Sequence, residues 1–457
     1  MTRRAPRVQH DFRSYATTLE SNSKGLVLKV SEGGKSSPKR LSQLWLRDNC
    51  RCVKCVNQDT MQRSFNTFQV CRSFLALVQV RSVILTTNRY QTKLPPNPFI
   101  KTKMELKLHV GPVDTNSGFL HADRWPKGSD SHQSSYSWAW LRSAVYGVEN
   151  KKLKNLGQVA FHHSKFTKKE EEKVSATSNP PEVSFDSVMA KGDVSGMADL
   201  TEKIRGYGIC FVTNTPKTPE ATNELLEAIG PIRNTHYGGF YDFVPDLAKA
   251  DTAYTNLALA AHTDTTYFTE PAGLQAFHML SHTSPPNKAN DDSSLGGQSL
   301  LVDGFYAAYR LKKEYPEAYE TLREVRLPWH ASGNDGVAIA PDRAYPVIEA
   351  SPYKFHRVRW NNDDRGVVPL NVNVDKWYSA ARRWDSILRR KQNEYWFQLE
   401  PGRVLIFDNW RVLHGRSAFE GLRRICGGYI NRDDFISRWK TSNFPRSEVI
   451  AANMQLK

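Results

Sequence analysis

The sequence predicts a mainly β protein with some α-helix, in which a small β-rich N-terminal domain precedes a larger β-sandwich or barrel. Two observations lead to this class. Short strand-like runs of apolar residues recur at close spacing after residue 183, whereas few stretches show helical periodicity. A charged stretch with proline and few apolar residues, KFTKKEEEKVSATSNPPE, separates this part from the residues before it. The 457 residues are enough for two such domains.

The boundaries follow from these changes in composition. We expect residues 1–24 to be a tail and residues 25–150 to be the β-rich domain, which opens with the alternating run KGLVLKV. Residues 151–182 are predicted to be a linker, and residues 183–457 form the main domain.

The main domain begins with two predicted helices. The stretch MADLTEKIRGYGICFV predicts a helix that stops at Gly206, followed by a buried strand. A second helix should start after Thr218, which caps it, with Pro219 at the first helical position. The strand-like runs that follow are GLQAFHML, QSLLVDGF, FHRVRW, RVLIFDNW and CGGYI. Between them one clear helix, DKWYSAARRWDSILRR, has an apolar face of Trp377, Ala381, Trp384 and Leu388.

The charge of the chain is strongly positive at +16, and residues 1–150 hold 23 Lys and Arg against 10 Asp and Glu. These basic residues are scattered among Ser, Thr and Pro without aromatic neighbours, which favours a solvated surface over a nucleic-acid-binding face. No apolar run reaches the about 18–20 residues of a membrane span. We therefore expect no nucleic acid and no membrane among the partners.

The six cysteines are too few for a disulfide framework in a chain of this length, which favours a reducing compartment. The first residues, MTRRAPRVQHDFRSYATT, are rich in Arg, Ser and Thr, as mitochondrial transit peptides are, but they include Asp11. The prediction is a cytoplasmic or mitochondrial protein.

A histidine and a carboxylate lie two residues apart in AAHTDTTYF, as His262 and Asp264. In an extended strand, residues two apart point to the same side, so both side chains can reach one metal ion. A third ligand would come from His414, at the end of the strand-like run RVLIFDNW. Two histidines and one carboxylate are typical of oxygen-activating iron(II) sites, which keep positions open. For the isolated motif, a pair of surface or core residues is the alternative.

The sequence around these residues resembles the Fe(II)- and 2-oxoglutarate-dependent dioxygenases, specifically the family that acts on trimethyllysine and γ-butyrobetaine. The similar stretches are YGICFV, DTAYTNLALAAHTDTTYF, EPAGLQAFHML, GGQSLLVDGFYAA, RVRWNN, PGRVLIFDNWRVLHGR and GGYINRDD. The resemblance implies a double-stranded β-helix (jelly-roll) fold and iron bound by His262, Asp264 and His414. It also implies O2 and 2-oxoglutarate as cosubstrates, ascorbate as reductant, and a homodimer, as in many relatives.

The implied reaction hydroxylates N6,N6,N6-trimethyl-L-lysine to its 3-hydroxy product, with succinate and CO2 released, as the first step of carnitine biosynthesis. One alternative is γ-butyrobetaine hydroxylation, the last step of that pathway. Another is a non-catalytic protein that binds methylated lysine.

By the same resemblance, an arginine after the distal histidine binds the far carboxylate of 2-oxoglutarate, a task that suits a bidentate guanidinium. The spacing to GGY favours Arg423, with Arg424 and Arg416 as alternatives and Ser299 as an assisting hydroxyl. The quaternary ammonium of the substrate would bind aromatic faces and a carboxylate. The implied residues of this cage are Tyr237, Tyr241, Asp251, Tyr254 and Tyr429; a core role is the alternative for each tyrosine.

Three cysteines stand close together in LRDNCRCVKC, as Cys50, Cys52 and Cys55. Their spacing suits a tetrahedral zinc, which needs one more ligand. The resemblance implies His132, just before SSYSWAWL, as that ligand, and a structural zinc; three unligated buried cysteines are the alternative. The residues between, especially within 71–128, match nothing expected in the family. They are either surface insertions or sequence from a retained intron.

Overall fold

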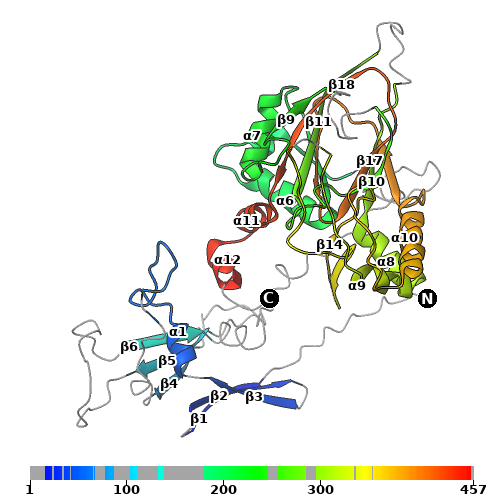
Figure 1. Cartoon of the computed structure of the whole chain (residues 1–457). Coiled ribbons are helices and arrows are strands. Elements are labelled where there is room, and N and C mark those ends of the chain that lie inside the picture. The colour runs from blue at the N-terminus through cyan, green and yellow to red at the C-terminus, as the bar shows by residue number, and fades with distance from the viewer. Residues whose placement is uncertain are drawn as a thin grey trace, which may run out of the picture. The chain divides into compact units, whose positions relative to one another are not determined.

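The structure is a computed structural model, and it describes residues 16–22, 25–32, 35–41, 43–64, 66, 78–86, 103–110, 132–137, 180–244, 256–284, 295–333, 336–352 and 354–453. The chain divides into two compact units, residues 1–149 together with 450–457, and residues 150–449 (Figure 1). Among the described residues, every helix is too short or too polar to cross a membrane.

The N-terminal unit is rich in strands, as predicted. Its first antiparallel sheet contains β1 (Ala16–Asn22), β2 (Gly25–Glu32) and β3 (Lys35–Leu41), followed by the helix α1 (Gln43–Asp48). Its second sheet contains β4 (Val78–Thr86), β5 (Lys103–Val110) and β6 (His132–Ser137).

One expectation for this unit needs correction. The strand β1 pairs along its length with β2, so the tail predicted over residues 1–24 includes a strand. This strand was missed because ATTLESN alternates only weakly between apolar and polar residues. The segment 71–128, predicted to be surface insertions or sequence from a retained intron, contains β4 and β5, and β5 pairs directly with β6.

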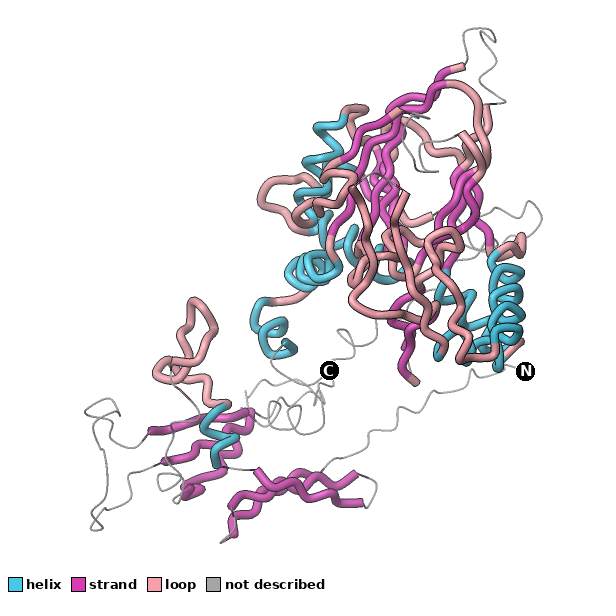
Figure 2. Tube along the Cα trace, in the orientation of Figure 1, coloured by secondary structure: helices cyan, strands magenta, loops and turns pink. Residues whose placement is uncertain are grey.

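The second unit is built on two sheets whose inner faces pack together (Figures 1 and 2). The strands pair antiparallel, except that β7 and β8 of the larger sheet pair in parallel. The larger has the order β7-β8-β16-β11-β18-β9 and the smaller β10-β17-β12-β15. The strands of the larger sheet are β7 (Glu182–Ser184), β8 (Ile209–Thr213), β9 (Tyr241–Phe243), β11 (Leu274–Thr283), β16 (Val404–Asp408) and β18 (Leu422–Ile430). Those of the smaller are β10 (Leu259–His262), β12 (Ser299–Asp303), β15 (Glu394–Phe397) and β17 (Val412–Arg416).

Buried side chains of both sheets form one cluster between them, including Phe211, Phe407 and Leu301. Two sheets in this arrangement fit the predicted jelly-roll. The five strand-like runs singled out in the sequence all contain strands; FHRVRW forms β14 (Lys354–Val358), which pairs with β13 (Ile348–Ser351) in a separate hairpin.

Helices cover the outer face of each sheet, because the alternate residues of the strands leave a second apolar face. The outer face of the larger sheet packs against α6 (Ser195–Tyr207), α7 (Pro219–Ile229) and α11 (Arg432–Asn443). The smaller sheet packs against α8 (Gly304–Glu314), α9 (Pro316–Glu324) and α10 (Val374–Leu388). A short helix, α5 (Phe185–Val188), completes the unit, and the helix α12 (Arg446–Asn453) spans the boundary at residue 449 between the two units.

The predicted helices are present with small differences. The helix α6 ends after Tyr207, with Gly208 in the left-handed conformation that closes it, so the predicted stop at Gly206 was wrong. The Thr218 side chain accepts a hydrogen bond from the Ala221 amide, as a cap should. On α10 the buried face is centred on Trp377 and Trp384 and also includes Ala380, while the predicted Ala381 is partly buried against the same cluster.

Candidate active site

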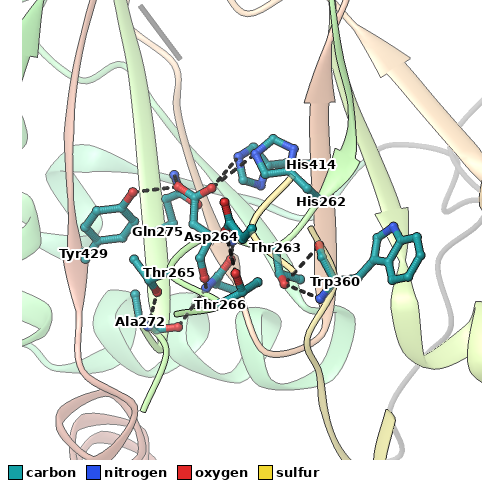
Figure 3. Close-up of polar contacts among 12 residues, drawn as sticks. His262, Thr263, Asp264, Thr265, Thr266, Ala272, Gln275, Trp360, His414 and Tyr429 are labelled. Atoms are coloured by element: carbon teal, nitrogen blue, oxygen red, sulfur yellow. Dashed lines mark hydrogen bonds and ion pairs between the residues drawn. The ribbon is translucent and has the colours of Figure 1, made fainter. Parts of the chain in front are cut away.

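The side chains of two histidines on paired strands converge with one carboxylate that follows the first strand. His262 is the last residue of β10 and pairs across the ladder with His414 of β17. Asp264 Oδ1 lies 3.2 Å from His262 Nε2 and 3.6 Å from His414 Nε2 (Figure 3). One ligand atom from each residue lies within 4.8 Å of the others. This donor set fits an iron(II) ion that keeps open positions.

Two local predictions about these residues were wrong in their geometry. His414 lies inside its own strand β17, because β16 already ends at Asp408. Asp264 lies beyond the end of β10 and is not on one strand with His262. Its carboxylate nevertheless lies beside both imidazoles, and the chain turns directly after it at Thr265, whose φ of 55° is left-handed.

The turn at Asp264 is held by an asparagine that no pattern in the sequence singles out. Asn409 accepts a hydrogen bond from the Asp264 amide at 2.8 Å and donates to the Asp264 carbonyl at 3.0 Å. Its amide also donates to the carbonyl of Ala272 at 3.0 Å. Asn409 lies between β16 and β17, the strand that contains His414. These bonds therefore connect the segment that carries His414 to the segment that carries Asp264. No periodicity predicts such a contact, since 145 residues separate the partners.

The two oxygens of Asp264 have separate roles. Oδ1 faces the histidines, whereas Oδ2 accepts hydrogen bonds of 2.6 Å from both Tyr429 Oη and Gln275 Nε2 (Figure 3). Gln275 was also missed, although alternation along GLQAFHML would have placed it beside Phe277 on the inner face. A carboxylate held in this way presents one oxygen to a metal in a fixed orientation.

At Asp264 and His414 the electrostatics favour the charge states that a metal ion requires, whereas at His262 burial is outweighed by the hydrogen bond and charge of Asp264, which raise its pKa. Burial alone would raise the pKa of Asp264, but His414, His262 and the Tyr429 hydroxyl outweigh it and hold that pKa below its usual range. Burial, and then the neighbouring His262, lower the pKa of His414 to about 3. An ionised carboxylate and a neutral imidazole are the forms that bind metal.

The bond from Tyr429 gives a first prediction. Tyr429→Phe keeps the ring but removes the donor to Asp264, so we expect metal affinity to fall by about 10–100-fold, as is usual for an outer-shell partner. Titration with Mn(II) or Co(II), followed by calorimetry or absorbance, measures this. The Michaelis constant for an ammonium substrate at saturating metal should change little, because the aromatic face remains. Unchanged metal affinity would show that the hydrogen bond does not orient the ligand.

A pocket extends from the metal ligands between the two sheets, and an arginine lies buried in its wall. Arg423 of β18 is 3% exposed, and burial, then the neighbouring Arg416, lower its pKa to about 9. Its guanidinium lies 5.6 Å from the centre of the Phe419 ring, and no described carboxylate lies within ion-pair distance. A buried cation without an acidic partner among the described residues is suited to an anionic ligand.

Of the other predicted contacts to 2-oxoglutarate, two lie on the pocket and one lies outside it. Arg416 and Ser299 line the same pocket as Arg423 and pair across neighbouring strands. Arg424 lies on the opposite face of β18, where it forms an ion pair with Asp242 at 2.5 Å. The structure therefore brings three of the four residues together and leaves Arg424 outside.

The described part of the predicted cage lies on the same pocket. Tyr237, Tyr241 and Tyr429 line it, and the rings of Tyr241 and Tyr429 lie 5.9 Å apart. The Tyr241 hydroxyl donates to the Ala276 carbonyl at 2.6 Å, which fixes its ring. Asp251 and Tyr254 lie outside the described residues. Further aromatic residues that line the pocket but were not predicted are Phe243, Tyr267 and Phe277.

The cysteine cluster lies in the N-terminal unit. One sulfur atom from each of Cys50, Cys52 and Cys55 lies within 4.8 Å of the others, and Cys52 Sγ lies 3.4 Å from Cys55 Sγ. Cys50 and Cys55 are buried. His132 begins β6, and its side chain lies outside the described residues.

The sequence was compared with protein-family profiles and with known proteins, and these comparisons identify the family of this chain. The profile described as "Taurine catabolism dioxygenase TauD, TfdA family" matches residues 167–429, more than half of the chain. The chain belongs to the TauD, TfdA family. Trimethyllysine dioxygenase of Neurospora crassa is 50% identical over 96% of this chain and 88% of its own length. The mitochondrial trimethyllysine dioxygenase of Mus musculus is 36% identical over 87% of this chain and 82% of its own.

A relative with a different substrate is more distant. Gamma-butyrobetaine dioxygenase of Homo sapiens is 24% identical over 86% of this chain and 89% of its own length. The three residues that could hold a metal ion, His262, Asp264 and His414, lie within the region that matches this dioxygenase family. The cysteine cluster precedes that region.

Proposed function

We propose that this dioxygenase hydroxylates N6,N6,N6-trimethyl-L-lysine at carbon 3, using O2 and 2-oxoglutarate and releasing succinate and CO2. The observation that carries the proposal is the 50% identity to a trimethyllysine dioxygenase over 96% of the chain. The pocket supports it, because it combines the three metal-ligating side chains with a buried arginine and several aromatic rings. The reaction is the first step of carnitine biosynthesis.

In this proposal His262, Asp264 and His414 hold iron(II), which when bound supplies the activation of O2 at the expense of 2-oxoglutarate. Tyr429 and Gln275 fix the Asp264 carboxylate, so that one oxygen faces the metal. Arg423 binds the distal carboxylate of 2-oxoglutarate, with Ser299 and Arg416 beside it.

The aromatic rings have a different task. Their faces are electronegative and attract a quaternary ammonium, which cannot donate a hydrogen bond. Tyr237 and Tyr241 line the described part of the pocket, and Asp251 and Tyr254 complete the proposed cage from outside the described residues. Binding the cation at a fixed distance from the ligands positions one C–H bond for reaction.

The test is a direct assay. Purified protein is incubated with Fe(II), 2-oxoglutarate, ascorbate as reductant, and either trimethyllysine or γ-butyrobetaine, and the products are analysed by mass spectrometry. We expect a gain of 16 daltons on trimethyllysine with matching succinate. A gain on γ-butyrobetaine alone would replace the proposal with the second reaction. Binding without turnover of either compound would favour a methyl-lysine-binding protein.

We also propose that Cys50, Cys52, Cys55 and His132 bind a structural zinc ion. The three sulfur atoms converge, and the buried Tyr136, four residues after His132 in β6, donates a hydrogen bond to the carbonyl of Leu46 in α1. This bond holds β6 beside the helix that leads into the cysteines, which supports His132 as the fourth ligand.

The zinc proposal predicts one zinc ion per chain in addition to iron. Cys52→Ser should lower the zinc content and the unfolding temperature of the N-terminal unit, because a structural zinc contributes directly to folding. Elemental analysis and calorimetry measure both quantities. Cys210→Ser is the control, since that buried cysteine lies in β8 of the other unit and should leave zinc unchanged. Full zinc content in the Cys52 variant would contradict the assignment.

The compartment belongs to the proposal as well. The mouse relative is named mitochondrial, and this chain begins with an Arg-, Ser- and Thr-rich stretch. Both observations support a mitochondrial location over a cytoplasmic one, which fractionation of cells expressing the full chain would test.

A further inference from the structure

Hydrogen bonds connect the segment that carries His262 and Asp264 to Trp360 and Asp364, which flank a short turn. At its first end, the Thr263 amide donates to the Trp360 carbonyl at 2.8 Å, and the Trp360 amide donates to Thr263 Oγ1 at 3.0 Å (Figure 3). At its second end, Thr266 Oγ1 donates to Asp364 Oδ2 at 2.5 Å. The residues between these contacts, 361–363, therefore form a turn fixed next to His262 and Asp264. We call residues 361–363 the head turn.

The head turn presents a carboxylate to the pocket. Asn361 and Asp363 both line the pocket that contains the metal ligands. Inside the turn, the Asp363 amide donates to Asn361 Oδ1 at 3.1 Å, which fixes the backbone and leaves the Asp363 carboxylate outside this bond. Asp363 is exposed, and no described Lys, Arg or His lies within ion-pair distance of it. Asp364 also lines the pocket, but its carboxylate accepts a hydrogen bond from Thr266 and anchors the turn.

The chemistry of the proposed substrate requires a binding group near the metal. In trimethyllysine, the reacting carbon 3 is bonded directly to the α-carbon, which carries an ammonium and a carboxylate. The quaternary ammonium is four bonds away from carbon 3 in the other direction. When carbon 3 lies at the metal, the α-ammonium must therefore lie near the metal ligands, in the pocket that Asn361 and Asp363 also line. γ-Butyrobetaine has no α-ammonium.

We infer that Asp363 binds the α-ammonium of trimethyllysine and thereby selects this substrate over quaternary ammonium compounds that lack an α-amine. The inference rests on the proposed function and deepens it. The aromatic rings recognise the quaternary ammonium that both classes of compound share, whereas Asp363 recognises the group that distinguishes them. A carboxylate next to an ammonium, shielded from water by bound substrate, makes a charge-assisted hydrogen bond.

The experiment compares two substrates in two proteins. The substrates are trimethyllysine and its analogue without the α-amine, 6-(trimethylammonio)hexanoate, and the proteins are the full chain and its Asp363→Asn variant. We expect the unaltered chain to prefer trimethyllysine in kcat/KM by about 10-fold or more, the effect of one hydrogen bond to a charged group. In the variant this preference should disappear, through a higher KM for trimethyllysine and an unchanged KM for the analogue.

Controls separate this result from general damage to the site. Asp363→Glu keeps the charge and should retain most of the preference, and Asp375→Asn removes an exposed carboxylate of α10 away from the pocket and should retain all of it. An unchanged preference in Asp363→Asn, or an equal loss on both substrates, overturns the inference. Failure of the unaltered chain to hydroxylate trimethyllysine would overturn the proposed function itself, a distinguishable result.

Discussion

Replacing Arg423 with methionine should strongly weaken 2-oxoglutarate binding while leaving the fold intact. The guanidinium is 3% exposed, and the described groups nearest to it are the Phe419 ring and a second cation, Arg416. Without an anion, this arrangement costs free energy, because a buried cation loses hydration that nothing replaces. A dicarboxylate ligand removes that cost, so much of its affinity should depend on this side chain. Losing the partner of a buried, hydrogen-bonded charge costs about 2–5 kcal/mol, so we expect the dissociation constant of 2-oxoglutarate to rise at least about 30-fold.

The neighbouring residue gives a matched control for this variant. Arg424→Met removes the same charge one position away, but its side chain pairs with Asp242 on the opposite face of β18 and is half exposed. It should leave 2-oxoglutarate binding within about a factor of two, since an exposed ion pair outside the pocket contributes little. Calorimetric titration of 2-oxoglutarate into metal-loaded protein measures both constants. The unfolding temperature of the Arg423 variant should equal or exceed that of the unaltered chain. Equal losses in both variants would contradict the assignment of Arg423.

The sequence alone could not decide which of these arginines faces the pocket. The strand-rich fold could be predicted because it depends on residue type and on period-two alternation, which are local properties. The three candidate metal ligands were found from residue type and from the resemblance of the surrounding sequence to a dioxygenase family, since Asp264 lies beyond the strand that ends at His262. Choosing among Arg416, Arg423 and Arg424 required the register of β18, since adjacent residues face opposite sides. An error of one residue in the register would therefore place the wrong arginine in the pocket and the right one on the outer surface. Alignment to GGY favoured Arg423, and the structure places Arg423 in the pocket and Arg424 outside it.

The residues that sequence reasoning missed act through long-range contacts. Asn409 is 145 residues from Asp264, and its side chain contacts only the backbone there, so no charge or periodicity singles it out. Tyr429 was expected to be part of an aromatic cage, but its hydroxyl donates to the Asp264 carboxylate. Side chains of this kind explain why a His-x-Asp spacing alone says little, since the fold must also fix the orientation of each ligand.

The second large effect should come from Asp264→Asn, which removes a charge from the metal site without changing its shape. The fold should tolerate the amide. A hydroxyl can donate or accept, and the Gln275 amide can be turned to present its oxygen, so both partners of Oδ2 can adapt to an amide nitrogen. What cannot be replaced is the negative charge beside the two imidazoles. A neutral amide oxygen is a much weaker ligand for iron(II), so metal affinity should fall further than the about 10–100-fold expected for Tyr429→Phe.

Two measurements separate the loss of charge from disruption of the site. Metal titration gives the affinity, and nuclear magnetic resonance of the metal-free protein gives the pKa of His262. Burial alone would lower that pKa, but the hydrogen bond and charge of Asp264 raise it above its usual value. In the Asp264→Asn protein the charge is gone, so burial should dominate and the pKa of His262 should fall. A lower pKa together with unchanged metal affinity would mean that Asp264 neighbours the metal without binding it. A fall in both identifies its Oδ1 as a ligand and its charge as the reason that iron(II) stays bound.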